Sequence, residues 1–212
     1  MTTPISAPGG EPLLRLSDVW LRIPAVARRP VLAGVDLEVH AGEVVGLVGE
    51  SGSGKSVTAR AVLGLVPRGA QVEGSVTVDG LDVLSASPGR LRRLRSQTAA
   101  MVFQDPRTGI NPLRRIGDHL TEGARFAQRG DVRAARGRAV ELLAAVGLPD
   151  PERHLRQFPH ELSGGMLQRV MIAGALMGSP RLLLCDEPTT ALDVTTQAEI
   201  VRILRRLQQE RG

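Results

Sequence analysis

A glycine-rich segment that ends in a lysine has the residue types and spacing that most directly indicate chemistry in this sequence. Residues 49–56 read Gly-Glu-Ser-Gly-Ser-Gly-Lys-Ser and match G-x-x-x-x-G-K-[ST], the pattern of a phosphate-binding loop. Glycines let such a turn close tightly, so its backbone N–H groups can surround phosphate oxygens. We expect these N–H groups to come from Gly49, Glu50, Ser51, Gly52, Ser53 and Gly54. Lys55, the single lysine of the chain, is predicted to bind the β- and γ-phosphates, and the Ser56 hydroxyl to ligate Mg²⁺.

Two adjacent acidic residues follow a short apolar run later in the chain. Residues 182–185 are predicted to form a buried strand, and Asp186 and Glu187 come directly after it. We expect Asp186 to hold the metal and Glu187 to orient and deprotonate the attacking water. Acids at a strand end are often only solvated, so this interpretation depends on the phosphate-binding loop being present as well.

A second glycine-rich helix start lies at residues 163–165. Ser163 is predicted to be the N-cap, and Gly164 and Gly165 expose backbone N–H groups at the positive end of a helix dipole. The simpler interpretation is a capped helix start and nothing more. Because one chain needs a single cradle for the γ-phosphate, we expect this one to serve the nucleotide of a second chain in a two-fold dimer.

These segments must be positioned by alternating strands and helices. Strands are expected over residues 13–23, 31–39, 44–48, 74–80 (at a sheet edge), 99–103 and 182–185. Helices are expected from Lys55 to near Leu65, and over residues 90–95, 113–128 and 131–147. Further helices should begin near Ser163 and at Thr195, the last opening with a capping box of Thr196 and Glu199.

The composition limits the classes of protein that fit. The chain has 212 residues, a net charge of +5 and 2% aromatic residues. Its arginines are interspersed with acids and it lacks stacking aromatics, so we expect no nucleic-acid partner. No apolar run approaches the length of a membrane-spanning helix, and the N-terminus does not read as a signal peptide. One cysteine excludes an internal disulfide.

The order of the motifs resembles the ATPase subunits of ABC transporters. The motifs are GESGSGKS, FQDP (residues 103–106), LSGGM (residues 162–166), LLLCDEP (residues 182–188) and ALD (residues 191–193). Finer features, the NP at residues 111–112, FPHELSGGM and DEPTTALDVT, are similar to importers of oligopeptides, dipeptides and nickel. The resemblance implies an α/β fold: a P-loop NTPase core with a mostly parallel sheet, an antiparallel β edge layer and a helical subdomain.

The resemblance also implies a division of the chain. Residues 1–10 would be a disordered tail, and residues 11–104 and 163–212 the nucleotide-binding core. Residues 105–162 would be the helical subdomain that docks on a permease. By the same resemblance, the chain ends before the strand that carries the family's switch histidine, and the core sheet is expected to lack at least one strand.

Ligands, roles and partners follow from the resemblance too. ATP and Mg²⁺ would be bound, with Gln104 acting beside Glu187 in catalysis by sensing the γ-phosphate and the metal. Asp193 would lie in the loop that crosses the dimer interface, and Ile23 would stand where the family stacks an aromatic ring on adenine. The partners would be a second ABC ATPase subunit, arranged head to tail, and integral-membrane permease subunits. The location would be peripheral, on the cytoplasmic face of the plasma membrane.

The function expected from the sequence is therefore ATP hydrolysis coupled to import, of peptides or nickel, through a separate permease. Two alternatives remain open. The chain could be a nucleotide-binding module without turnover, or a soluble ABC ATPase that takes no part in transport. The transported substrate is not encoded here, because specificity would lie in other chains.

Overall fold

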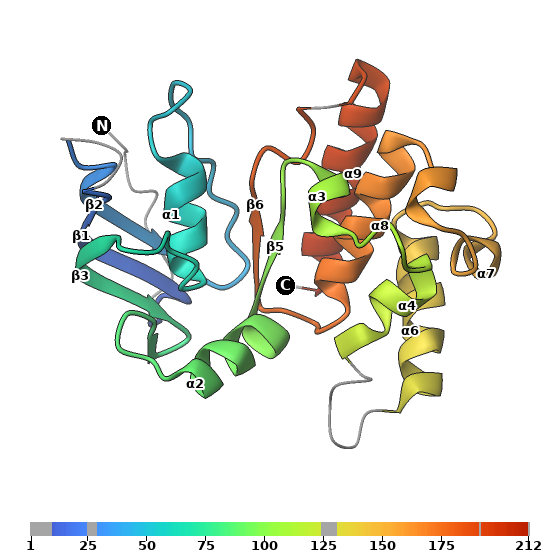
Figure 1. Cartoon of the computed structure of the whole chain (residues 1–212), viewed down its shortest axis with the longest axis horizontal. Helices are drawn as coiled ribbons and strands as arrows, with labels where there is room; N and C mark the ends of the chain where they lie inside the picture. The colour runs from blue at the N-terminus through green and yellow to red at the C-terminus, as the bar shows by residue number, and fades with distance from the viewer. Residues whose placement is uncertain (1–9, 25–28, 124–130, 191, 212) are drawn as a thin grey trace. The chain divides into compact units, whose positions relative to one another are not determined.

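The chain forms two compact units in the computed structural model, which describes residues 10–24, 29–123, 131–190 and 192–211 (Figure 1). The first unit ends at Arg95 and the second runs from Ser96 to Arg211. The tail predicted for residues 1–10 lies outside the described residues except for Gly10.

The first unit is built on an antiparallel sheet with the strand order β2-β1-β3-β4. Its strands are β1 (Leu14–Arg22), β2 (Leu32–Val39), β3 (Gln71–Val78) and the short β4 (Leu81–Asp82). Asp79 and Gly80 both have positive φ, of 50° and 73°, and form the tight turn between β3 and β4. The prediction of an antiparallel strand over residues 74–80 is therefore confirmed by β3, but its predicted place at the sheet edge was wrong. Strand β3 pairs with β1 on one side and β4 on the other, and β4 is the edge strand.

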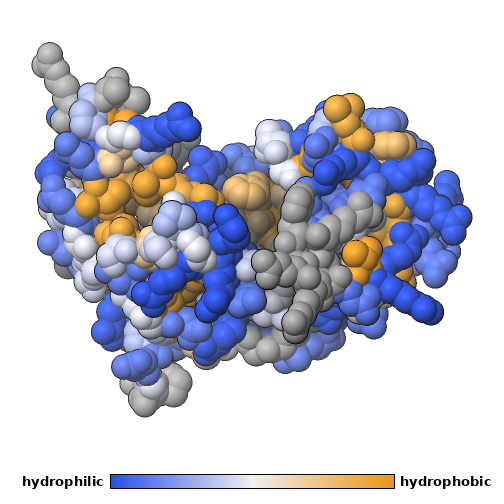
Figure 2. All heavy atoms as spheres, turned by 60° about the horizontal axis from the view of Figure 1, so that its bottom comes forward, coloured by the Kyte–Doolittle hydropathy of each residue, from blue (hydrophilic) through white to orange (hydrophobic). Residues whose placement is uncertain are grey.

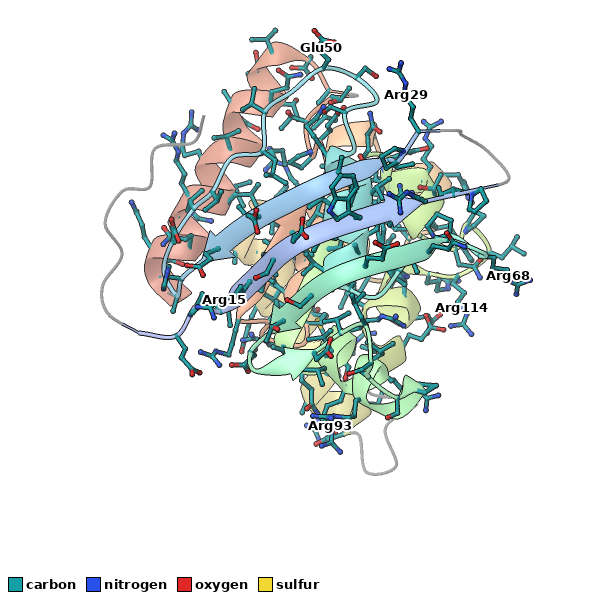
Figure 3. All side chains as sticks on the ribbon, turned by 90° about the vertical axis from the view of Figure 1, so that its left-hand side faces the viewer. Arg15, Arg29, Glu50, Arg68, Arg93 and Arg114 are labelled. Carbon is teal, nitrogen blue, oxygen red and sulfur yellow. The ribbon has the colours of Figure 1, made fainter. Side chains whose placement is uncertain are left out.

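The two faces of this sheet differ in polarity. One face buries apolar side chains that recur at alternate positions, such as Leu14 and Leu16. The other carries exposed ion pairs, including Arg15 with Glu38, whose nitrogen and oxygen are 2.8 Å apart (Figure 3). Exposed pairs contribute little stability. The sheet is held instead by its apolar face.

The chain between the sheet and the first helix departs from the prediction. Residues 44–48 form no strand, and their apolar side chains are exposed, with Val44 at 75% and Val48 at 98%. An uninterrupted apolar run is typical of a strand with neighbours on both sides, but no described strand pairs with this one. The prediction of a buried strand here was wrong. Figure 2 shows hydrophobic residues at the surface of this unit.

Helix α1 (Lys55–Val62) follows the phosphate-binding loop and ends earlier than the expected Leu65. The stop is Gly64, whose φ of +63° is left-handed and whose added Cβ would lie 3.2 Å from a Leu91 methyl. Arg95 donates hydrogen bonds of 2.8 and 3.1 Å to the carbonyls of Leu63 and Gly64. The basic segment predicted to be helical forms α2 (Pro88–Arg93) and a π-helical turn (Leu94–Thr98), and it thus caps α1.

The second unit combines a parallel strand pair with a group of helices. Strand β5 (Ala99–Val102) pairs in parallel with β6 (Leu182–Cys185), in a register that sets Val102 opposite Cys185. The helices are α3 (Pro106–Gly109), α4 (Ile116–Leu120), α6 (Val132–Ala145), α7 (Pro151–His154), α8 (Gly164–Leu176) and α9 (Val194–Arg211). A 3₁₀ turn (Pro159–Glu161) precedes α8.

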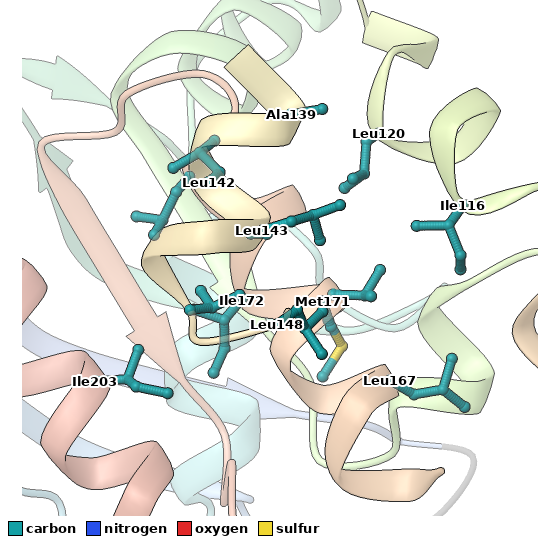
Figure 4. Close-up of a cluster of buried hydrophobic side chains, with 14 of the residues drawn as sticks. Ile116, Leu120, Ala139, Leu142, Leu143, Leu148, Leu167, Met171, Ile172 and Ile203 are labelled. Carbon is teal, nitrogen blue, oxygen red and sulfur yellow. The ribbon is translucent and has the colours of Figure 1, made fainter. Parts of the chain in front are cut away.

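One apolar cluster holds these helices together (Figure 4). Leu142 and Leu143 of α6 and Ile172 of α8 are fully buried in it. The predicted start of α6 is confirmed, since Asp131 accepts hydrogen bonds from two backbone N–H groups of the first turn. Its predicted stop at Gly147 is confirmed by a φ of +78°. Of the helix expected over residues 113–128, the segment 124–128 lies outside the described residues.

Helix α9 begins differently from the prediction. Asp193 Oδ1 accepts the Thr196 N–H at 3.0 Å, and the Thr196 hydroxyl donates to Asp193 Oδ2 at 2.7 Å. Asp193 is therefore the N-cap, and the capping box expected for Thr196 and Glu199 was wrong. Asp193 directly precedes the helix and aspartate is a better N-cap than threonine, and Glu199 pairs with Arg169 of α8 instead. None of the helices in the described ranges has the length and apolar composition needed to cross a bilayer.

Candidate active site

The residues singled out in the sequence fall into both units. Ile23 and residues 49–56 belong to the first. Gln104, residues 163–165, the acids at 186 and 187, and Asp193 belong to the second.

The backbone of the phosphate-binding loop explains why its glycines are required. Gly52 and Gly54 have φ of +81° and +93°, in the left-handed region that favours glycine. A Cβ on Gly54 would also lie 2.6 Å from a Leu32 methyl carbon and 3.0 Å from the Val31 carbonyl oxygen. A Cβ on Gly49 would lie 2.8 Å from the Ser53 hydroxyl oxygen. The loop therefore has a fold that larger residues would not allow.

Lys55 points into the loop that precedes it. Its Nζ donates hydrogen bonds of 2.8 Å to the carbonyl oxygens of Gly49 and Glu50, the latter at the exposed end of the loop (Figure 3). Helix α1 starts at Lys55 with no side-chain cap and no acid in its first turn, so its N-terminal dipole has no negative side chain there. An ammonium set among oxygen acceptors at such a helix end fits a bound phosphate group.

The register of the parallel strands brings Gln104 and Glu187 together in the second unit. Gln104 lies two residues after Val102, and Glu187 lies two residues after its partner Cys185, so both follow the carboxyl ends of the two parallel strands. Gln104 Nε2 donates to Glu187 Oε2 at 2.9 Å. The Thr190 hydroxyl donates to the same oxygen at 3.0 Å. The structure thus joins two predicted residues and adds one that the sequence analysis missed.

Glu187 and its neighbour Asp186 occupy different environments. Asp186 is 5% exposed, and its N–H donates to the Val102 carbonyl at 2.9 Å, which continues the ladder between the strands. Glu187 is exposed and has a φ of +45°, a strained backbone conformation for a residue with a long side chain. Such strain gathers at functional sites. No group of three or more metal-ligating side chains occurs in the described part of the chain.

The second glycine-rich helix start is capped as predicted. The Ser163 hydroxyl accepts the Met166 N–H at 3.3 Å. A Cβ on Gly164 would meet open space, whereas a Cβ on Gly165 would lie 2.9 Å from the Thr196 methyl carbon. The hydrogen bonds from the Thr196 N–H and hydroxyl hold the pKa of Asp193 below its usual range. Thr196 therefore contacts both the glycine of α8 and the N-cap of α9.

Thr190, which the sequence analysis missed, carried a readable signal, and Thr196, expected only in a capping box, carried the same one. Thr190 follows Glu187 by three residues, and Thr196 follows Asp193 by the same interval. A hydroxyl at that spacing can reach back to a carboxylate within one turn of chain. Ile23 is half-buried just beyond the end of β1, and its contact with adenine stays a prediction.

Known proteins match the chain over most of its length. The family model described as "ABC transporter" matches residues 32–190. The oligopeptide transport ATP-binding protein OppD of Escherichia coli K12 is 41% identical over 211 residues, 99% of this chain and 62% of that protein. OppD of Mycobacterium tuberculosis is 48% identical over 95% of this chain and 33% of its own length. The probable D,D-dipeptide transport ATP-binding protein DdpD of E. coli is 43% identical over 95% of this chain and 62% of that protein.

Solved structures agree with these matches. The ATP-binding cassette MJ0796, in a dimeric structure bound to ADP and Pi, matches with a TM-score of 0.81 and 31% identity. That match covers 94% of this chain and 84% of the cassette. The fold is therefore the α/β P-loop NTPase fold of ABC cassettes. The chain spans from one third to about three fifths of the length of the OppD relatives, at 33%, 51% and 62%.

Proposed function

The chain belongs to the ABC transporter family, and on that premise we propose that it binds and hydrolyses ATP to drive import through a separate permease. Its relatives are named as transporters of oligopeptides and D,D-dipeptides, so we propose peptides as the cargo. The nickel alternative has less support, because these relatives are named for peptides.

The observation that carries this proposal is the hydrogen bond between Gln104 and Glu187. It places an exposed carboxylate and an amide just beyond the carboxyl ends of β5 and β6, with Gln104 Nε2 and Glu187 Oε2 2.9 Å apart. A carboxylate so placed can orient a water and take its proton, and an amide can respond to the charge of a γ-phosphate. Hydrolysis would convert ATP and water to ADP and phosphate.

The nucleotide would be held by the phosphate-binding loop. We assign the β- and γ-phosphates to Lys55 and to the N–H groups of residues 49–54, and adenine to an apolar contact with Ile23. Mg²⁺ would be held by Ser56, Asp186 and Gln104. When bound, the metal would neutralise the charge that develops on the phosphates.

The remaining proposals concern assembly. Ser163, Gly164, Gly165 and Asp193 would face the nucleotide of a second, head-to-tail ATPase subunit. Support comes from the dimeric structures of the cassette MJ0796. We assign residues 105–162 to docking on the permease and residues 11–104 and 163–212 to the nucleotide-binding core. Docking would place the protein at the cytoplasmic face of the plasma membrane.

Glu187→Gln tests the proposed hydrolysis. Glutamine keeps the size of the side chain and an oxygen that can accept from Gln104 and Thr190, so the fold and MgATP binding should be retained. The base is lost, so ATP turnover should fall at least a hundredfold, in the range expected for a general base. The measurements are phosphate release and the dissociation constant for MgATP.

Glu141→Gln is the matched control in the absence of the permease, because Glu141 is an exposed acid on α6 that is not among the residues assigned to the nucleotide. It should leave turnover unchanged. Unchanged turnover in Glu187→Gln would contradict the assignment of the base. A wild-type protein that binds MgATP without hydrolysing it would favour the nucleotide-binding module. Hydrolysis that no permease stimulates would favour the ABC ATPase without a transport role.

A further inference from the structure

The turn after β6 holds Glu187 by a single carboxylate oxygen. Oε2 accepts the amide of Gln104 at 2.9 Å and the hydroxyl of Thr190 at 3.0 Å. The Thr190 N–H also reaches the Glu187 carbonyl oxygen at 3.3 Å, which closes a turn around the residue. Both side-chain donors therefore meet one oxygen, and Oε1 receives neither of them.

The two donors differ in how they are attached to Glu187. Gln104 is 83 residues away along the chain, so its hydrogen bond depends on the pairing of β5 with β6. Thr190 is three residues away, in the turn that Glu187 itself begins. Any movement of Glu187 carries Thr190 with it. The local hydrogen bond can thus persist while Gln104 exchanges its partner.

We propose that Thr190 is a positioning residue that fixes the rotation of the Glu187 carboxylate so that Oε1 is the oxygen offered to the attacking water. This inference rests on the proposed hydrolytic function. Gln104 is proposed to bind the γ-phosphate and the metal, so in the loaded site its side chain has other partners. Thr190 then remains the side chain that restrains the carboxylate.

The strained backbone at Glu187 supports this assignment. A φ of +45° persists only where the surrounding structure favours it strongly. Thr190 supplies two hydrogen bonds to Glu187, one to the side chain and one to the main chain. The backbone bond alone would close the turn. The hydroxyl bond instead ends on the carboxylate, where it restrains the reacting group.

Thr190→Val and Thr190→Ser test the proposal in the purified protein with MgATP. Valine keeps the branched shape and removes the hydroxyl, whereas serine keeps the hydroxyl. Thr190→Val should lower kcat about tenfold, equivalent to roughly 1.4 kcal/mol in the barrier. KM for MgATP and the melting temperature should stay within error of wild type. Thr190→Ser should keep most of the turnover.

The neighbouring Thr189 provides a matched control, because Thr189→Val makes the same chemical change one residue away. Its carbonyl, which valine keeps, accepts the Gln197 amide at 2.9 Å. Thr189→Val should turn over like wild type. The proposal is overturned if Thr190→Val keeps the wild-type kcat, if Thr189→Val loses as much, or if Thr190→Ser fails to retain turnover.

The outcomes also separate this inference from the proposed function. Turnover that is lost in Glu187→Gln but normal in Thr190→Val would refute the role of Thr190 alone. A wild-type protein that binds MgATP without turnover would refute both.

Discussion

Lys55→Ala is the most direct perturbation of the phosphate-binding loop. The Lys55 ammonium makes two hydrogen bonds of 2.8 Å to the carbonyls of Gly49 and Glu50. Both carbonyls lie in an exposed loop, so water can replace the ammonium when alanine is introduced. We therefore expect the free energy of unfolding to fall by no more than about 2 kcal/mol, the net value of two such hydrogen bonds.

The effect on nucleotide affinity should be larger. A unit charge on Lys55 and one on a phosphate 4 Å away attract by about 4 kcal/mol at an effective dielectric constant near 20. Binding must also break the two hydrogen bonds to the loop carbonyls, at a cost of about 2 kcal/mol together. The difference, about 2 kcal/mol, corresponds to a roughly thirtyfold rise in the dissociation constant for ATP.

Calorimetric titration of ATP into wild type and Lys55→Ala measures this change. Because the chain has one lysine, acylation by an amine-selective reagent gives a second measurement. Outside the N-terminal amine, only Lys55 can react, and MgATP should protect it. Lys55→Arg keeps the charge as a control, but its larger head group must displace the backbone of Gly49, so we expect weakened binding there too. Unchanged affinity in a folded Lys55→Ala, or acylation that ATP does not slow, would refute the assignment.

Two further predictions concern stability. Gly165→Ala should lower the free energy of unfolding by about 1–3 kcal/mol, because its Cβ would lie 2.9 Å from the Thr196 methyl carbon. Adding Thr196→Ser removes that methyl group and should restore most of the lost stability in denaturant titrations. Gly164→Ala is the control, because a Cβ there would meet open space, and it should leave stability unchanged. Equal effects of Gly165→Ala and Gly164→Ala would contradict the contact with Thr196. Burial lowers the pKa of His119 below its usual 6.5, so the folded chain favours the neutral ring. The contribution of His119 to the free energy of unfolding should be full above pH 6.5 and decline as the pH falls from there toward the pKa of the folded state. His119→Gln should flatten this dependence of stability on pH. Identical slopes in wild type and His119→Gln would show that another group titrates.

Much of the site could be predicted because it is encoded in short segments. Gly52 and Gly54 adopt a left-handed φ, which favours glycine at these positions. This requirement is set by the local backbone alone, so the sequence motif is enough to predict it. Ser163 and Asp131 cap their helices within one turn, and the structure confirms both. Asp186 and Glu187 follow β6 as expected. Each of these predictions needs only a few consecutive residues.

The predictions that failed needed information from elsewhere in the chain. An apolar run such as residues 44–48 indicates that a segment can be buried, but it cannot specify the strands that would cover it. The same limit applies to β3, which reads as an edge strand until β4 pairs with it. The capping box at Thr196 failed for a different reason, since Asp193 accepts the Thr196 backbone N–H that Glu199 would have to accept, and Glu199 pairs with Arg169 instead.

Contacts between motifs that are distant in sequence could not be predicted from the motifs themselves. One such contact restricts how helices α8 and α9 can move relative to each other. Gly165 and Asp193 come from motifs that are separate in sequence, yet Thr196 touches the first with its methyl group and binds the second with its hydroxyl. The approach to Gly165 is close enough that not even a Cβ would fit. The N-terminus of α8 therefore cannot move toward α9 without displacing Thr196, and Thr196 carries the N-cap of α9 with it. If Ser163–Gly165 and Asp193 both face a second subunit, as proposed, Thr196 would make them meet that subunit as one rigid surface.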